Sequence, residues 1–295
     1  MLRKELGKPN LLMFLYHKTE TYFLIWFLRC LNFAMKDTFT VITGASQGLG
    51  KAFAEELARD KKNLLLVSLP DEELPRLCKH FQKEYGIQAE SYETDLGKKE
   101  NILGLATWIN KNFDIDTLIN NAGIGGTKKF DEVSASYIEN MICLNVMATS
   151  ILTHQLLPNL KSQKRSYVLN ICSLAAFSPM AYKTVYPASK AFIYSFSRSL
   201  NEELKNTNIT VSVVSPGPMK TNGNTTKRIN KQGIFTKMAL QEPSAVAKYS
   251  IEKMRKGKAV IVPNRLSWLV INFFPSWIMI PIMTKKFKKE LNVQK

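Results

Sequence analysis

A tyrosine and a lysine stand four residues apart in the segment VYPASKAF, at Tyr186 and Lys190. Residues at this spacing lie on one face of a helix. A free phenol titrates near pH ~10, and a neighbouring ammonium favours the phenolate and so lowers the pKa of the phenol. Such a pair could exchange a proton with a reacting oxygen, although the same spacing is common on surface helices. The pair therefore indicates chemistry only if the rest of the chain supplies a site around it.

The elements that would position this pair follow a regular alternation of apolar, strand-like runs and helical segments. The expected strands are residues 39–43, 63–68, 88–94, 116–120, 166–172, 210–215 and 259–263. The expected helices are residues 50–59, 71–85, 98–112, 136–157, 188–204 and 244–255. Alternation with short links predicts an α/β fold, a Rossmann-type doubly wound parallel sheet of about seven strands with helices on both faces.

A glycine-rich turn, TGASQGLG, lies between the first expected strand and the first expected helix. Gly44 permits a tight turn, Gly48 lets the backbone approach a pyrophosphate, and Gly50 allows close packing of helix on strand. The helix N-terminus would offer free N–H groups to the anion. The turn predicts a dinucleotide site, with a plain glycine-rich turn as the alternative.

The spacing T-G-x-x-x-G-x-G, together with YPASK, resembles the classical short-chain dehydrogenase/reductase family. Further marks of that family occur in order, and the resemblance covers residues 38–263. They are Asp95 in TDL, NNAG at 120–123, Asn145 in LNV, Ser173 in NICSLAAF, and SPGPMKT at 215–221.

The resemblance implies a catalytic group of Ser173, Tyr186, Lys190 and Asn145. Tyr186 would be the proton donor to a carbonyl oxygen, and Lys190 would lower its pKa and hold the nicotinamide ribose. Ser173 would donate a hydrogen bond to the substrate oxygen, and Asn145 would order a water that relays protons from Lys190. The implied function is an NAD(P)-dependent oxidoreductase acting on a hydrophobic or acyl-like carbonyl or alcohol. The alternative is a non-catalytic NAD(P)-binding sensor on the same fold.

The resemblance also implies a set of cofactor-binding residues, most of them beyond the carboxyl ends of strands. They are Gly44, Ser46, Gln47, Gly48, Leu49, Gly50, Ser68, Asp95, Asn121, Ala122, Gly123, Tyr186, Lys190, Pro216, Gly217 and Thr221. No metal site is expected, because the histidines are scattered and the cysteines form no CxxC pair.

The choice between NADP and NAD is expected to depend on the end of the second strand. An acidic residue there binds the ribose 2′-hydroxyl and repels a 2′-phosphate. Here Ser68 takes that position, while Leu69 and Gln47 stand where NADP users often carry cations. The missing acid favours NADP(H) over NAD(H), although an inward-facing Asp71 would favour NAD(H).

The composition is that of a basic globular protein. The 295 residues are 45% hydrophobic, and 41 lysines and arginines against 24 acidic residues give a net charge of +17. The lysines are dispersed and no nucleic-acid-binding motif occurs, so no nucleic-acid partner is expected. Four cysteines without a disulfide pattern favour the cytoplasm.

Two segments flank the expected catalytic domain at 37–264. The N-terminal extension, residues 1–36, has two apolar bursts that are too short to span a bilayer, and no cleavage site follows them. Met35 could be the native start. Within the domain, the resemblance implies a substrate lid near 221–242.

The C-terminal tail, residues 265–295, begins with an uncharged run at 266–284, which Pro275 and Pro281 interrupt and lysines follow. Its tryptophans and lysines suit peripheral contact with an anionic membrane surface through 266–289. A membrane span, packing over the domain or its substrate cleft, and a subunit contact are the alternatives. The resemblance further implies a homodimer or homotetramer, formed through the helices at 136–157 and 188–204.

Overall fold

The computed structural model describes residues 37–219, 240–264, 268–269 and 276–292. The strands are β1 (Phe39–Thr43), β2 (Asn63–Ser68), β3 (Ala89–Glu93), β4 (Ile115–Asn120), β5 (Ser166–Ile171), β6 (Ile209–Val214) and β7 (Val260–Ile261). The α-helices are α2 (Gly48–Arg59), α3 (Leu74–Tyr85), α4 (Lys99–Asn112), α5 (Ala135–Ile142), α6 (Ala148–Lys161), α7 (Val185–Glu203), α10 (Pro243–Arg255) and α12 (Ser276–Asn292). The N-terminal extension and most of the expected lid lie outside the described residues.

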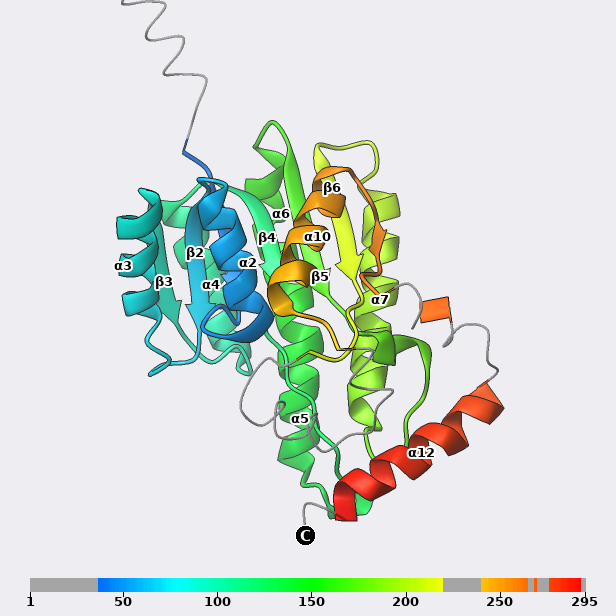
Figure 1. Ribbon diagram of the computed structural model, residues 1–295. Coiled ribbons are helices and arrows are strands. Elements are labelled where there is room, and N and C mark those ends of the chain that lie inside the picture. Colours follow the sequence, from blue (N-terminus) through cyan, green and yellow to red (C-terminus); the bar gives the residue numbers. More distant parts are fainter. Residues whose placement is uncertain (1–36, 220–239, 265–267, 270–275, 293–295) are drawn as a thin grey trace, which may run out of the picture. The chain divides into compact units, whose positions relative to one another are not determined.

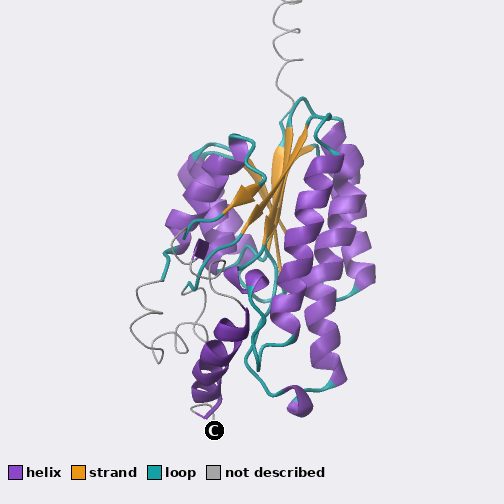
Figure 2. Cartoon of the chain, turned by 90° about the vertical axis from the view of Figure 1, so that its right-hand side faces the viewer, coloured by secondary structure: helices purple, strands orange, loops and turns teal. Residues whose placement is uncertain are grey.

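The seven strands form one sheet in the order β3-β2-β1-β4-β5-β6-β7, and all of their pairings are parallel. Figure 1 shows the strands and helices along the chain, and Figure 2 shows the sheet between two layers of helices. The chain runs outward from β1 to β3 and then returns to place β4 on the other side of β1. Ligands of such sheets bind at this reversal, beyond the carboxyl ends of the strands. The predicted doubly wound fold is confirmed.

The central strands are buried on both faces, so their successive side chains enter different cores. Ile42 and Leu66 belong to the core that α2, α3 and α10 cover, whereas Val41 and Val67 belong to the opposite core. That second core lies under α4 and α6 and includes Leu204, directly after α7. Near-continuous apolar strands are typical of parallel sheets with helices on both faces, and this is why the central strands lack polar alternation.

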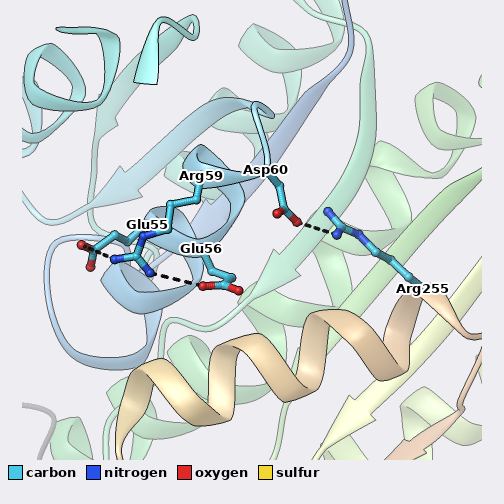
Figure 3. Close-up of polar contacts among 5 residues, drawn as sticks. All are labelled: Glu55, Glu56, Arg59, Asp60 and Arg255. Atoms are coloured by element: carbon cyan, nitrogen blue, oxygen red, sulfur yellow. Dashed lines mark hydrogen bonds and ion pairs between the residues drawn. The ribbon is translucent and has the colours of Figure 1, made fainter. Parts of the chain in front are cut away.

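Helices α2 and α10 pack side by side over one face of the sheet (Figure 1). Ion pairs lie along their outer surface. Arg59 pairs with two glutamates of its own helix, and Arg255 at the end of α10 pairs with Asp60 after α2 (Figure 3). Surface pairs of this kind contribute little to stability, about 0–1 kcal/mol each. The two helices are therefore held mainly by their buried apolar side chains.

Two helices begin elsewhere than the sequence predicts. α3 begins at Leu74 rather than at 71, because Asp71 and Glu73 have positive φ values of 64° and 53°, which a helix does not allow. α7 begins at Val185 rather than at 188, so Tyr186 lies in its first turn. The proline that follows Tyr186 is compatible with this start, because the N–H that it lacks has no partner in a first turn.

The single helix expected over 136–157 is two α-helices joined by a π-helical turn. α5 ends at Ile142, the π-helical turn η2 spans Cys143–Met147, and α6 continues from there to Lys161. Apolar periodicity does not reveal one extra residue in a helical turn, so the sequence predicted an uninterrupted helix. π-Helical turns are rare and frequently occur at functional sites.

The stretch Ala135–Lys161 is also, within the described parts of the chain, the one helix whose length and composition would allow it to cross a membrane. Three leucines of this stretch, Leu152, Leu156 and Leu160, are buried in the core beside the sheet.

The C-terminal tail contains an α-helix, α12, which begins at Ser276. Pro281 lies inside α12, so the expectation that it interrupts this run is wrong. Pro281 is exposed, so its ring has room on the outer side of the helix, and its missing N–H removes one backbone hydrogen bond. Trp277 and Ile282 are 75% and 57% exposed, whereas Phe287 is buried.

Candidate active site

The glycine turn connects β1 to α2 at the reversal point of the sheet. Gly44 has a φ of 65°, a conformation that favours glycine. A Cβ on Gly50 would press against the carbonyl oxygen of Gly44 and lie 2.6 Å from Asn121 Nδ2, so only glycine allows this approach. The side chain of Gln47, the residue before α2, makes no capping hydrogen bond to the helix. The first N–H groups of α2 are therefore suited to an anion such as a pyrophosphate.

The NNAG segment after β4 is fastened to this turn by hydrogen bonds. The N–H groups of Asn121 and Ala122 both donate to Thr43 Oγ1 at 3.0 Å. Asn121 Nδ2 also donates to the carbonyl oxygens of Thr43 and Gly44, each at 3.0 Å. The ends of β1 and β4 are thus held together at the point where the sheet reverses.

Tyr186 and Lys190 lie one turn apart at the start of α7. Lys190 Nζ is 6.0 Å from the centre of the Tyr186 ring and donates a hydrogen bond to the Ile171 carbonyl at 2.8 Å. A Cβ on Gly123, the last residue of NNAG, would lie 3.4 Å from Lys190 Nζ, and one on Gly125 would lie 2.9 Å from the Tyr186 ring. The structure therefore brings the predicted pair together, directly against the loop that begins with NNAG.

Lys190 is 5% exposed, and this burial determines its titration. Removal from water lowers the pKa of Lys190, and negative charge on the nearby Cys172 sulfur acts in the opposite direction. The same burial raises the pKa of Cys172, because a thiolate there would also lose its hydration. An anionic group near Lys190, such as a phenolate at Tyr186, would favour the charged form of the lysine.

Asn145 lies in the π-helical turn, and its side chain is fixed by the loop after NNAG. Its Oδ1 accepts from the Ile124 N–H at 2.9 Å, and its Nδ2 donates to the Ile124 carbonyl at 2.9 Å and to Ser189 Oγ at 3.0 Å. A Cβ on Gly123 would lie 3.1 Å from Asn145 Oδ1. Asn145 therefore lies between the loop that carries Gly123 and the helix that carries Lys190, a position compatible with its predicted relay role.

Ser173 lies two residues beyond β5, before the short 3₁₀ turn η3 (Leu174–Phe177). Its Oγ accepts a hydrogen bond from the Ala175 N–H at 3.1 Å. This bond leaves the hydroxyl proton available to a substrate oxygen, which is the role that was predicted for Ser173. Because η3 packs against α7, Ser173 and Tyr186 come from neighbouring elements.

The segment that follows β2, where residues are expected to discriminate between NADP and NAD, contains an acid that sequence reasoning did not single out. Ser68 is buried and donates through Oγ to the Leu69 carbonyl at 3.0 Å. Asp71 is exposed, but Glu72 accepts a hydrogen bond from Ser46 Oγ in the glycine turn. Sequence reasoning considered only Asp71. The left-handed backbone at Asp71, after which Glu72 meets the glycine turn, produces no periodic pattern in the sequence.

Two further predicted cofactor residues are Asp95, in the turn before α4, and Leu49, in α2. Asp95 Oδ1 accepts from the Gly97 N–H at 2.8 Å, so this carboxylate also shapes the turn before α4. Leu49 is a buried residue of α2 and packs in the core, so its side chain is not available to a ligand.

The segment after β6 lies next to η3. The Pro216 carbonyl accepts from the Leu174 N–H at 3.1 Å, which ties this segment to the turn that follows Ser173. Gly217 donates its N–H to Gln241 Oε1 at 2.7 Å. The last predicted cofactor residue, Thr221, lies outside the described residues.

A pocket that is partly open to solvent lies directly beside Tyr186. It is lined by Gly126, Lys128, Phe130, Val133, Tyr137, Met141, Tyr182, Lys183, Thr184, Val185 and Tyr186. Most of these residues were not predicted, although the closeness of Lys183 and Thr184 to Tyr186 in the sequence was an available signal. The pocket is where the carbonyl of a substrate could meet the phenol.

The residues at the glycine turn and around Lys190 suit a dinucleotide. Within the parts of the chain that the structure describes, no three His, Cys, Asp or Glu side chains form a group that could hold a metal ion. The cradle at Gly44 and Gly50, which a Cβ would fill, and the open N-terminus of α2 instead suit the phosphates of a dinucleotide. The buried ammonium of Lys190 suits the hydroxyl groups of a ribose.

Comparison with known proteins agrees with this geometry. Residues 38–232 match the family model described as short chain dehydrogenase. The very-long-chain 3-oxoacyl-CoA reductase of Anas platyrhynchos is 34% identical over 182 residues, which are 60% of this chain and 58% of the relative. An uncharacterized oxidoreductase of Staphylococcus saprophyticus is 30% identical over 72% of this chain and 94% of its own length. The match to the Anas enzyme therefore spans less than two thirds of that relative.

A solved structure shows the same fold with a nucleotide bound. The short-chain dehydrogenase from Sphingobium yanoikuyae in complex with NADPH has a TM-score of 0.72 and 27% sequence identity. The similarity covers 80% of this chain and 92% of that one.

Proposed function

Because this chain belongs to the short-chain dehydrogenase family of oxidoreductases, we propose that it is a carbonyl reductase or alcohol dehydrogenase that uses a nicotinamide cofactor. The observation that carries this proposal is the buried Lys190 beside Tyr186, close to the NNAG segment that is bonded to the glycine turn. A non-catalytic sensor would not need a desolvated lysine beside a phenol.

In the proposed reduction of a carbonyl, each of the four site side chains has a separate role. Ser173 and Tyr186 hold the substrate oxygen, and the Tyr186 hydroxyl gives it a proton as negative charge develops there. The charge of Lys190 favours the phenolate that remains, and Asn145 holds the loop and helix between which a proton-relaying water would lie. A bound nicotinamide would supply the hydride.

The substrate is proposed to be a 3-oxoacyl thioester or a related hydrophobic carbonyl compound. Support comes from the apolar pocket residues Phe130, Val133 and Met141 beside Tyr186, and from the reductase name of the Anas relative.

A preference for NADP(H) remains a prediction based on Ser68, which can hydrogen-bond a 2′-phosphate without repelling it. Glu72 weighs in the opposite direction, because its carboxylate contacts the glycine turn through Ser46. The family relationship supports a nicotinamide cofactor in either form.

The activity assay follows the absorbance of reduced cofactor while purified protein is given NADPH or NADH with an acetoacetyl thioester. We expect consumption of the reduced cofactor that depends on both protein and thioester. The ratio of kcat/KM for NADPH to that for NADH shows which cofactor the protein prefers. If neither cofactor is consumed with this thioester, its neutral ester or other 3-oxo compounds, the proposed activity is wrong.

The C-terminal tail is proposed to touch an anionic membrane surface. On α12 the exposed Trp277 and Ile282 lie near the exposed Lys285 and Lys288 in the sequence. Aromatic and aliphatic side chains enter the boundary of a bilayer, while lysines beside them attract anionic headgroups. The helix therefore combines both kinds of group that a peripheral contact needs.

Sedimentation with lipid vesicles tests the membrane contact. The protein should sediment with vesicles that contain anionic lipid, and the Trp277→Ser/Ile282→Ser variant should stay in the supernatant. Leu103→Ser, which removes an exposed leucine on α4, is the control and should sediment like the unmodified protein. Equal sedimentation with neutral vesicles, or retention of sedimentation in the double variant, would contradict the proposal.

The chain is also proposed to assemble as a homodimer or homotetramer through α5–α6 and α7. Support comes from Phe192 on α7, which is 43% exposed and stacks on Phe196 one turn further along. Light scattering of the purified protein measures the mass of the assembly, and a monomer at all concentrations would contradict this proposal.

A further inference from the structure

Tyr182 lines the pocket beside Tyr186 and has an unusual backbone conformation. Its φ is 65°, in the left-handed region that bulky residues rarely adopt. It is the third residue of a tight turn, in which the Lys183 N–H donates to the Met180 carbonyl at 3.3 Å. Where the third residue of a turn has a positive φ, glycine or asparagine is preferred. Tyrosine therefore occupies a position where either of these residues would be less strained.

Packing within the domain does not explain a tyrosine at this position. The side chain of Tyr182 is half-buried, and it belongs to none of the apolar cores in the described parts of the chain. The other described residues that combine a positive φ with a side chain are Lys61, Asp71 and Glu73, and all three are exposed. Of these four residues, Tyr182 is the one that lines the pocket.

The turn that contains Tyr182 is bonded to the active site on both sides. The Lys128 N–H, from the loop after NNAG, donates to the Tyr182 carbonyl at 2.8 Å. The Lys183 carbonyl accepts from the Tyr186 N–H at 3.0 Å, in the first turn of α7. Strained backbone of this kind persists only where the surrounding structure holds it, and it is concentrated at ligand sites.

We propose that Tyr182 is a substrate-binding residue, whose ring contacts the carbon chain next to the carbonyl while the carbonyl oxygen meets Tyr186. This inference rests on the proposed function and adds to it a residue that affects which substrates bind. Phe130 and Val133 line the same pocket, so the ring of Tyr182 belongs to a largely apolar wall. An aromatic ring offers a large and rigid apolar surface, which neither glycine nor asparagine would supply.

The test replaces Tyr182 by glycine and, separately, by asparagine, which tolerates the same backbone without making it as flexible. Both variants should keep the Tm of the unmodified protein or raise it by about 2–4 °C, because the strain is relieved. Their KM for acetoacetyl-CoA, or for ethyl acetoacetate if the thioester is not turned over, should rise about tenfold. That is the effect of losing contact with roughly two methylene groups, and kcat should be retained.

Two further variants separate the ring from the strain. Tyr182→Phe keeps the ring and loses only the hydroxyl, so it should restore the KM of the unmodified protein. Lys61→Gly is the matched control, because Lys61 has a φ of 58° but lies between α2 and β2 and does not line the pocket. It should also keep or raise the Tm, and its KM should not change.

An unchanged KM in both Tyr182→Gly and Tyr182→Asn would overturn the proposal. A clear fall in Tm in both variants would overturn it as well, because Tyr182 would then be a structural residue. Either result leaves the proposed reductase function intact. Failure of that function would appear differently, as no turnover of any 3-oxo compound by the unmodified protein, and it would remove the basis of this inference.

Discussion

Replacing Tyr186 by phenylalanine is expected to lower kcat by about 10²–10⁴-fold, the range that positioned acid–base groups contribute. The ring remains, so its packing against the loop at Gly125 is kept and only the hydroxyl is lost. Cofactor affinity should change little, because Lys190 and the glycine turn are untouched. Turnover is followed by cofactor absorbance, and binding by the fluorescence of reduced nicotinamide.

Tyr194→Phe is the control for this experiment. Tyr194 lies two turns further along α7, where its ring packs against Phe177 at 4.8 Å between centres. Its hydroxyl has no part in the proposed proton transfer, so kcat should be retained. Full activity of the Tyr186→Phe variant would show that another group protonates the substrate.

Replacing Lys190 by methionine should move activity and stability in opposite directions. Activity should fall about 10²-fold or more, because the phenolate loses its cation and the ribose its clamp. Stability should rise at neutral pH, because burial lowers the pKa of Lys190 and the folded state therefore holds this ammonium at a cost. Thermal unfolding and kcat are measured on the same preparations.

The stability gain expected for Lys190→Met should depend on pH. A lysine whose pKa is lowered by folding destabilises most at low pH, where both folded and unfolded chains carry the proton. As the pH rises from the folded pKa to the unfolded value near ~10.4, the unfolded chain binds more protons and the penalty fades. The Tm advantage of Lys190→Met should therefore shrink with rising pH. Lys205→Met, at an exposed lysine, should show no such trend, and a pH-independent advantage of Lys190→Met would contradict the assignment.

Much of the fold could be predicted because its signals are local. The first two strands have the predicted bounds, since apolar runs between glycine and polar turns mark buried parallel strands clearly. The glycine turn and the Tyr186–Lys190 pair could be found because each needs particular residue types at a fixed spacing. β7 is shorter than predicted, with two residues at Val260–Ile261, because an edge strand pairs only as far as its neighbour allows.

The parts that escaped prediction depend on contacts between distant segments. Glu72 reaches Ser46 only because the chain after β2 adopts left-handed backbone at Asp71, and Lys128 meets the segment of Lys183 through a loop–loop hydrogen bond. Neither of these two contacts produces a periodic pattern in the sequence. Strand ends and motif spacing therefore predict the Tyr186–Lys190 pair but not the other residues that line the pocket.

The π-helical turn at Cys143–Met147 gives the position of Asn145 an unusual dependence on chain length. Successive α-helical residues are rotated by about 100° around the helix axis. Deleting one residue from this turn would therefore rotate the side chains of α5 relative to those of α6 and break their contacts on one side of the turn. Substitutions leave that rotation in place, whereas a single deletion removes it. Homologues could therefore vary in side chains along α5 and α6 while the number of residues between the two helices stays the same.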